Sequence, residues 1–283
     1  MHITALITCH NRKMTTLSCL RALFLNRRSN SVRLDAVLVD DGSSDGTVDA
    51  VKEDFPLVKI EHGDGSLFWN RGMHRAQEVA MRARPDFVLW LNDDTMLSED
   101  ALDRLLSAYE QLSGKVGHAV IVVGATVDRI TKNLTYAGME RVSAIRPLQF
   151  RKVWHPEETI ECQAMNGNIV LIPRQIVERL DNLDPVYEHA MGDIDYALRA
   201  RAAGFRIFVA GGVMGYCSNN PVAGTEADRD LPFRARWKKL MGPKGLPPRS
   251  WLYFTSRHGS VAWPLFFAWP YVRFLIKEIS PRD

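Results

Sequence analysis

Two adjacent carboxylates, Asp93 and Asp94, follow an apolar run at residues 87–91 and are preceded by Asn92. A buried strand that ends in this way places negative charge at the edge of a sheet, where the ligands of open α/β sheets bind. Neighbouring carboxylates resist joint ionisation unless a cation neutralises them. Their oxygens suit Mg2+ or Mn2+, which commonly also take oxygens from a substrate phosphate. The alternative interpretation is a simple turn that leads into a helix near Ser98.

Polar residues also follow the first two apolar runs, at residues 3–9 and 36–40. The first run is followed by His10-Asn11-Arg12 and the second by Asp41-Gly42-Ser43-Ser44-Asp45. The carboxyl ends of parallel strands meet at one edge of a sheet, so we expect these groups to converge on the carboxylate pair. Such an edge suits a ribose, a base and a metal-bound diphosphate better than a bare anion.

The chain lacks the two common phosphate-loop signatures. It has no GxxxxGK[ST] segment, and no GxGxxG follows the first predicted strand. ATPases of the P-loop class and NAD-dependent dehydrogenases are therefore disfavoured.

Strand-like and helix-like segments alternate through the first half of the chain. Predicted strands lie at residues 3–9, 36–40, 58–61 and 87–91, and predicted helices at 15–25, 47–54, 71–82 and 98–112. This alternation predicts βαβ units and an α/β fold with a mostly parallel sheet. After residue 117 strands and helices no longer alternate regularly. Further strands are predicted at 119–127, 168–172 and 206–210, and helices at 173–180 and 193–203.

Charge is distributed unevenly along the 283 residues. Residues 229–283 carry 11 Lys and Arg against 3 Asp and Glu, a net charge of +8, whereas residues 1–228 carry 25 against 30, a net charge of −5. We therefore predict a catalytic domain at 1–228, with halves at about 1–117 and 118–228, and a basic, apolar C-terminal extension at 229–283. A basic extension of this kind suits an anionic surface such as phospholipid.

Residues 261–272 of the extension form an apolar run rich in Trp, Phe and Tyr. The run is too short to span a bilayer, but aromatic residues beside lysines and arginines suit the membrane interface. The alternative is a helix packed on the catalytic domain or on a second subunit, as in a homodimer. The sequence shows no feature that favours nucleic acid as a partner.

The cysteines and the N-terminus indicate the compartment. The four cysteines, Cys9, Cys19, Cys162 and Cys217, have no CxxC spacing, and no signal peptide is evident at the N-terminus. We expect reduced structural thiols in a cytoplasmic protein, held at the inner face of the cytoplasmic membrane.

Several motifs, taken in order, resemble the family 2 glycosyltransferases with a GT-A fold. They are Thr8-Cys9-His10-Asn11-Arg12, Val37-Leu38-Val39-Asp40-Asp41-Gly42-Ser43-Ser44-Asp45-Gly46-Thr47, Leu91-Asn92-Asp93-Asp94 and Gly192-Asp193-Ile194-Asp195-Tyr196-Ala197-Leu198-Arg199. Two further segments, Asn166-Gly167-Asn168 and Tyr253-Phe254-Thr255-Ser256-Arg257-His258, resemble the bacterial rhamnosyltransferase-like branch of that family. The resemblance spans roughly residues 3–260 and implies a Rossmann-like central sheet flanked by helices.

The resemblance implies roles for matching residues. It makes Asp94 the holder of Mg2+ or Mn2+ and Asp193 the general base that takes a proton from an acceptor hydroxyl. It assigns nucleotide binding to Thr8, His10, Asn11, Arg12, Asp41 and Asp93. The alternatives are an Asx-turn for Asp41 and a helix N-cap for Asp193.

The segment after the third predicted strand should border the donor sugar. Gly65 permits close backbone approach, Trp69 suits an apolar wall, and Arg71 suits a contact with diphosphate. The alternatives are that Trp69 belongs to the core and that Arg71 is solvated. Asp195 precedes Arg199 by four residues, which favours a structural ion pair.

Two positions depart from the family pattern. Gly192 stands where many members have Glu, and the region 215–218 has no His, although many members supply a metal-binding His there. The retained carboxylate of Asp193 still matches the base, but metal binding then depends on Asp94, phosphate and water.

The function predicted from the sequence is inverting, metal-dependent glycosyl transfer. The donor is a nucleotide-sugar, dTDP-rhamnose or a UDP-sugar, and the acceptor is a bacterial surface glycan or a lipid-linked glycan. The alternatives are a sugar-phosphate nucleotidyltransferase and a non-catalytic glycan-binding protein with the same fold.

Overall fold

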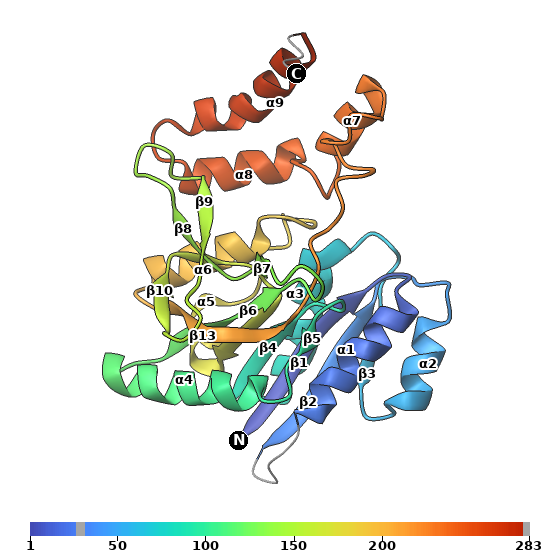
Figure 1. Ribbon diagram of the computed structural model, residues 1–283, viewed down its shortest axis with the longest axis vertical. Coiled ribbons are helices and arrows are strands. Elements are labelled where there is room, and N and C mark those ends of the chain that lie inside the picture. Colours follow the sequence, from blue (N-terminus) through green and yellow to red (C-terminus); the bar gives the residue numbers. More distant parts are fainter. Residues whose placement is uncertain (27–31, 280–283) are drawn as a thin grey trace.

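Parallel strands form the half of the central sheet that carries the N-terminal polar loops (Figure 1). The computed structural model describes residues 1–26 and 32–279. The parallel strands are β4 (Phe87–Leu91), β1 (His2–Cys9), β2 (Arg33–Asp40) and β3 (Lys59–His62), in that order across the sheet. Their apolar side chains are buried on both faces, as expected for parallel strands covered by helices.

The other half of the sheet contains antiparallel strands. β12 (Ile169–Pro173) lies between β4 and β6 (Val120–Val127) and is antiparallel to both. β13 (Arg206–Tyr216) is parallel to β6, and β10 (Ile160–Cys162) is antiparallel to β13. The sheet is therefore mixed but mostly parallel along its central path, and the α/β prediction is confirmed.

Short strands complete the sheet and build a second, smaller one. β5 (Met96–Leu97) pairs with β13, and β7 (Leu134–Tyr136) pairs with β6. The second sheet has the order β11 (Ala164–Met165), β8 (Gly138–Arg141) and β9 (Phe150–Val153). This small sheet lies beside α6, between the central sheet and the C-terminal helices.

Helices cover both faces of the central sheet. They are α1 (Lys13–Leu25), α2 (Thr47–Asp54), α3 (Phe68–Met81), α4 (Ala101–Val116), α5 (Arg174–Leu180) and α6 (Gly192–Ala202). Three further helices lie apart from the sheet, in the described part of the C-terminal extension: α7 (Phe233–Leu240), α8 (Pro248–His258) and α9 (Trp263–Ile279). One core joins the sheet to α1 and α4, with Leu20 and Leu105 fully buried. The other joins it to α3, α5 and α6, with Met73 and Tyr196 fully buried.

The described part of the C-terminal extension contains α7, α8 and α9, of which the sequence offered a helix only at residues 261–272, and only as an alternative. α8 packs on the domain through Trp251 and Phe254, which contact a cluster that includes Tyr187 and Leu198. α9 lies against α8, with Trp251 Nε1 donating to Phe267 O at 3.1 Å (Figure 1). α9 therefore packs on other parts of the extension, and contact of residues 261–272 with a membrane or a second subunit stays a prediction. Residues 280–283 lie outside the described part of the chain.

Within the described residues, no helix combines the length and the apolar character needed to cross a membrane. The four cysteines are free and buried, which agrees with the expectation of structural thiols.

Candidate functional site

The carboxylates of Asp93 and Asp94 share one cation, the guanidinium of Arg12. Arg12 Nη1 lies 3.0 Å from Asp93 Oδ1 and 2.9 Å from Asp94 Oδ2. The carboxylates follow β4 and the arginine follows β1, and the parallel pairing of these strands brings their ends together. The prediction that these groups meet at one sheet edge is confirmed.

The two carboxylates have different surroundings. Burial raises the pKa of Asp93 to about 7; Arg12 opposes this rise and the charge of Asp94 adds to it. Asp93 Oδ2 is buried without a hydrogen-bond partner among the described residues, whereas the side chain of Asp94 is 27% exposed. Asp93 therefore presents an unused acceptor inside the site, and Asp94 faces solvent.

The segment that carries both carboxylates is itself a turn. Thr95 N–H donates to Asn92 O at 3.0 Å, so the predicted turn is confirmed and is compatible with a ligand-binding role. The turn leads into β5, however, and the helix that follows begins at Ala101. Asn92 Oδ1 accepts from Trp69 Nε1 at 2.7 Å. Asn92 is therefore hydrogen-bonded to Trp69, and the charged groups of this turn are the carboxylates of Asp93 and Asp94.

Asp94 is the residue whose chemistry fits a divalent cation. Its Oδ1 accepts a weak hydrogen bond from Cys217 Sγ at 3.4 Å. Burial raises the pKa of Cys217 to about 12, and a thiol is a poor ligand for Mg2+ or Mn2+. Within residues 1–26 and 32–279, no group of three or more His, Cys, Asp or Glu could hold a metal. A cation would be held by Asp94 and by diphosphate oxygens, an arrangement common for Mg2+.

Hydrogen bonds join the loops that follow β1 and β2. Asn11 has a left-handed φ of 51°, donates its N–H to Ser43 Oγ at 2.8 Å and accepts from Ser44 N–H at 2.8 Å. His10 Nδ1 lies 2.6 Å from Asp41 O. His10 and Asn11 are exposed, so they hold the two loops together at the rim of the site.

The loop after β3 holds the carboxylate of Asp41. Asp41 Oδ1 accepts from Gly65 N–H at 2.8 Å, and its Oδ2 accepts from Phe68 N–H at 2.9 Å. The local turn bond is made instead by Asp40, whose Oδ2 accepts from Ser43 N–H at 3.1 Å. The Asx-turn interpretation of Asp41 is therefore wrong. Each of its oxygens keeps a second lone pair with which to accept from a base.

Thr8 lies deeper than the other predicted nucleotide-binding residues. Its hydroxyl donates to Val39 O at 3.2 Å, and its side chain packs beneath Gly72 of α3. The structure thus places Thr8 in the floor of the site, and direct contact with nucleotide stays a prediction.

Asp193 lies in the first turn of α6 and contacts the loop before β12. Its Oδ2 accepts from Gly167 N–H at 3.0 Å, and its Oδ1 accepts from Ile194 N–H at 2.9 Å. Burial raises its pKa to about 6, although these backbone bonds oppose the rise. The N-cap residue is Met191, so the interpretation of Asp193 as an N-cap is wrong. A carboxylate with this pKa is ionised at neutral pH and is more basic than an ordinary aspartate.

The departure from the family pattern at Gly192 has a steric reason. A Cβ on Gly192 would overlap Asn70 Oδ1. Asn70 is fully buried, and its Nδ2 donates to Asp184 O and Tyr187 O, both at 2.8 Å. Asn70 therefore anchors the loop that leads to α6 and occupies the space that a glutamate side chain would need.

Trp69 connects the carboxylate pair with the surroundings of Asp193. Its Nε1 binds Asn92, and its ring lies so close to Gly167 that a Cβ there would overlap it. The N–H of Gly167 in turn donates to Asp193. The indole also packs edge-to-face on Trp90, with ring centroids 6.0 Å apart. Core packing of Trp69 is confirmed, and because the residue is only partly buried its contact with a sugar stays a prediction.

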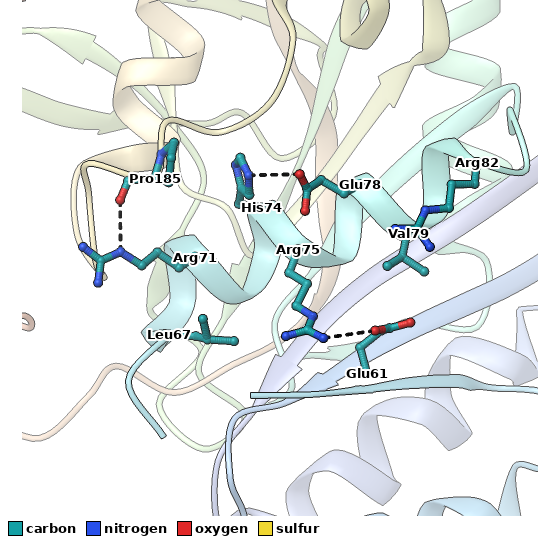
Figure 2. Close-up of a pocket in the computed structure, with 9 residues that line it drawn as sticks. All are labelled: Glu61, Leu67, Arg71, His74, Arg75, Glu78, Val79, Arg82 and Pro185. Carbon is teal, nitrogen blue, oxygen red and sulfur yellow. Dashed lines mark hydrogen bonds and ion pairs between the residues drawn. The ribbon is translucent and has the colours of Figure 1, made fainter. Parts of the chain in front are cut away.

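Arg71 lies on the outer side of α3 (Figure 2). Its Nε donates to Pro185 O at 3.0 Å, and its Nη2 lies 3.5 Å from Glu188 Oε1. It lines a cavity of about 440 Å³, together with His74 and Arg75 of the same helix. The structure thus ties Arg71 to the loop before α6, and its contact with diphosphate stays a prediction.

The predicted ion pair between Asp195 and Arg199 is confirmed as part of a larger cluster. Asp195 is fully buried, with Arg199 Nε at 2.7 Å, Arg257 Nη1 at 3.0 Å and His258 Nε2 at 2.8 Å. Burial acts to raise the pKa of Asp195, but His258, Arg199 and Arg257 together lower it to about 2. The cluster fastens the end of α8 to α6.

His189 is a residue of this region that sequence reasoning missed. Its Nδ1 is buried without a partner among the described residues, and its ring meets Phe68 edge-on. Burial, followed by the charges of Lys244 and Arg12, lowers its pKa to about 4. Lys244 of the C-terminal extension thus lies near enough to His189 for its charge to affect the pKa of that histidine. The spacing of the two residues in the sequence does not indicate this.

Comparison with known proteins identifies a family. The family described as "Glycosyltransferase like family 2" has a sequence model that matches residues 2–237. No curated protein matches the chain at a significant level.

Two solved structures illustrate the similarity in fold. The mannosyltransferase PcManGT from Pyrobaculum calidifontis, in complex with GDP-Man and Mn2+, has a TM-score of 0.56 and 17% identity, over 96% of this chain and 80% of that chain. Residues 1–349 of TarS from S. aureus, in complex with UDP, have a TM-score of 0.56 and 13% identity, over 90% of this chain and 70% of that chain. At these identities the likeness supports the fold alone.

Proposed function

Because the chain belongs to glycosyltransferase-like family 2, we propose that it transfers a sugar from a nucleotide-sugar donor to an acceptor hydroxyl with inversion at the anomeric carbon. The observation that supports this proposal is the link through Trp69. That indole binds Asn92, which precedes the carboxylates at the end of β4, and packs on Gly167, whose N–H donates to Asp193. On this basis we propose that the group that binds the leaving diphosphate and the group that accepts the proton border one space.

The chemistry that we assign to these residues is a single displacement. Asp193 accepts the proton of the acceptor hydroxyl while that oxygen bonds to the anomeric carbon. The bond from this carbon to the diphosphate breaks, and its electron pair leaves with the diphosphate. Attack from the face opposite the leaving group inverts the configuration. Arg12 stabilises the negative charge that develops on the diphosphate.

A divalent cation fits this scheme at Asp94. When bound there together with the diphosphate, Mg2+ or Mn2+ would supply further electrostatic stabilisation of the leaving group. To Asp93 we assign a hydrogen bond with a ribose hydroxyl, and to Asp41 one with the base. PcManGT, which has a similar fold, was solved in complex with Mn2+ and is therefore a precedent for a divalent cation in this fold.

The finer identity of the substrates follows from the resemblance to the rhamnosyltransferase-like branch. We propose dTDP-rhamnose or a UDP-sugar as donor and a bacterial surface glycan or lipid-linked glycan as acceptor. The complexes of the fold neighbours contain GDP-Man and UDP, so guanosine and uridine donors belong in the same screen. Family membership favours this function over the nucleotidyltransferase and the non-catalytic binding protein.

The exposed face of α9 supports a peripheral membrane contact. Leu265, Trp269, Val272 and Ile276 follow one another at helical spacing, and Leu265 and Trp269 are 72% and 54% exposed. Arg273 and Lys277 flank this stripe, and basic residues beside an apolar helix face suit an anionic bilayer surface. We therefore place the enzyme at the cytoplasmic face of the membrane. Sedimentation with anionic vesicles should fall for Trp269→Ser, and unchanged sedimentation would refute this placement.

Donor binding and transfer can be measured separately. A thermal-shift panel of nucleotide-sugars, with and without Mn2+, should reveal a stabilising donor. Asp193→Asn should keep that stabilisation and lose transfer, whereas Asp103→Asn on α4 is exposed and should change neither. A panel without any stabilising nucleotide would refute the proposal. Release of diphosphate from a nucleoside triphosphate would instead identify a nucleotidyltransferase.

A further inference from the structure

A second cavity, of about 390 Å³, lies between β8, α6 and the C-terminal end of α8. Its walls carry Arg141 from β8, Arg201 from α6, and Arg257 and His258 from α8. No carboxylate is among the described residues that line it. The cavity is therefore strongly basic, and the mechanism above does not use it.

The charges behind this cavity are only partly compensated. Arg257 and His258 contact Asp195, and Arg201 Nη1 lies 3.4 Å from Glu161 Oε1. The described residues give Arg141 no ion-pair partner. Burial, followed by the charge of Arg201, lowers the pKa of Arg141, so the two guanidinium groups lie near enough to repel. An anion between them would relieve this repulsion.

The larger cavity beside α3 provides a contrast within the same protein. There His74 Nε2 lies 3.5 Å from Glu78 Oε1, and Arg75 Nη2 lies 3.4 Å from Glu61 Oε2 (Figure 2). Both glutamates line that cavity, so His74 and Arg75 already have partners within its own walls. The cavity at Arg141 lacks such partners and is the better candidate for an anionic ligand.

Two structural paths connect the cavity at Arg141 to the proposed base. Arg201 follows Asp193 by eight residues on α6, which corresponds to about 12 Å along the helix. On the other side, Arg141 N–H donates to Gln163 Oε1 at 2.8 Å, and Gln163 lies four residues before Gly167, which contacts Asp193. A ligand that filled the cavity could thus belong to the same molecule that presents its hydroxyl to Asp193.

We propose that the cavity lined by Arg141 and Arg201 binds a phosphate group of the acceptor, at a distance from the hydroxyl that receives the sugar. Guanidinium groups present planar pairs of donors that match phosphate oxygens, and two converging arginines favour a phosphate over a neutral glycan. The inference rests on the proposed function, because it assigns the bound group to the acceptor of that reaction. The phosphate belongs either to a soluble glycan or to a lipid headgroup.

Calorimetry can test the site without any transfer assay. Inorganic pyrophosphate is titrated into the full chain with the donor site filled by a nucleoside diphosphate, so that only binding outside the donor site is measured. Arg141→Gln should weaken this binding at least about tenfold, as expected when a charged hydrogen-bonding group is lost. Arg146→Gln is the matched control, because Arg146 is exposed on the β8–β9 loop and does not line the cavity.

Vesicles distinguish the two sources of phosphate. If Arg141→Gln weakens pyrophosphate binding alone, the phosphate belongs to a soluble glycan; if it also weakens binding to phosphatidylglycerol vesicles, the phosphate belongs to a lipid. If Arg141→Gln binds pyrophosphate as the wild type does, the proposal is overturned. The failure of the proposed function would show separately, as the absence of donor binding in the thermal-shift panel.

Discussion

Gly192 and Asn70 occupy adjoining space at the start of α6, so that any side chain on Gly192 would overlap Asn70 Oδ1. Asn70 also fixes the loop through its bonds to Asp184 O and Tyr187 O. These contacts explain why the residue before the proposed base is glycine in this chain. They also suggest that the base owes its position to a side chain on α3.

Gly192→Ala should therefore displace the start of α6. We expect a loss of about 1–3 kcal/mol in the free energy of unfolding, which is typical of overpacking, and a lower kcat with donor affinity retained. Urea unfolding and single-turnover transfer would measure the two effects. Gly204→Ala at the other end of the helix has open space around it but a φ of 89°, so it controls for backbone strain without the clash. A Gly192→Ala enzyme with wild-type kcat would contradict this account.

The pH dependence of kcat/KM for the acceptor should report Asp193. Because burial raises its pKa to about 6, the carboxylate is ionised and able to accept a proton above that pH and is protonated below it. With saturating donor and acceptor well below its KM, kcat/KM should fall about tenfold per pH unit on the acidic side, as for a single essential base. Donor affinity, measured separately, should rise as the pH rises through about 7, because Asp93 then loses its proton and becomes a better hydrogen-bond acceptor. A kcat/KM that stays constant through the region of pH 6 would exclude Asp193 as the base.

Removal of Arg12 should expose the repulsion between the two carboxylates at the end of β4. Arg12→Ala leaves Asp93 and Asp94 without their shared cation, so nucleotide affinity should weaken by about 10- to 100-fold, the range expected for a lost charged hydrogen bond. High Mn2+ should recover part of that affinity, because the metal then supplies the missing positive charge. Arg129→Ala, on an exposed loop, is the control for net charge. If the Arg12→Ala enzyme bound nucleotide as tightly as the wild type, Arg12 would not be the cation that offsets Asp93 and Asp94 during nucleotide binding.

A histidine in place of Cys217 should strengthen metal binding. Cys217 Sγ lies 3.4 Å from Asp94 Oδ1, and an imidazole nitrogen is a better ligand than a protonated thiol. The Mn2+ concentration for half-maximal activity should fall in Cys217→His, because the imidazole adds a second protein ligand beside Asp94. Cys217→Ser controls for loss of the thiol alone. Chelation of metal with EDTA should lower transfer in all three proteins, and full activity in EDTA would remove the metal from the proposed chemistry.

Asp195 should contribute to stability rather than to chemistry. Its replacement by Asn leaves Arg199, Arg257 and His258 around an uncharged group, and breaking a buried cluster of this kind costs about 3–5 kcal/mol. Its pKa in the folded state is lowered from 3.8 to about 2, so the stabilisation is complete above pH 3.8 and is lost as the pH falls through about 2. The difference between wild type and Asp195→Asn should shrink over that interval. Asp103→Asn, at an exposed position of α4, is the control.

The alternation of apolar runs with helical segments was enough to predict most of the sheet. β4 and α2 begin and end where the pattern places them, because each is bounded by turn-forming residues and has a regular apolar period. The antiparallel insertion of β12 between β4 and β6 was not predictable, because an apolar run carries no information about its direction. α7 and α8 were missed, and α9 was only an alternative, because proline and basic residues interrupt the period that identifies a helix.

The sequence by itself determined which residues carry charge at the sheet edge, since acidic and polar groups at successive strand ends must converge in any parallel sheet. It also placed Asp193 at the start of a helix and paired Asp195 with Arg199. Only the tertiary structure decided the partners of these groups: Arg12 between Asp93 and Asp94, Cys217 beside Asp94, and Asn70 against Gly192. Such contacts join residues far apart in the chain, and their geometry depends on how helices and strands pack, which local sequence pattern does not encode.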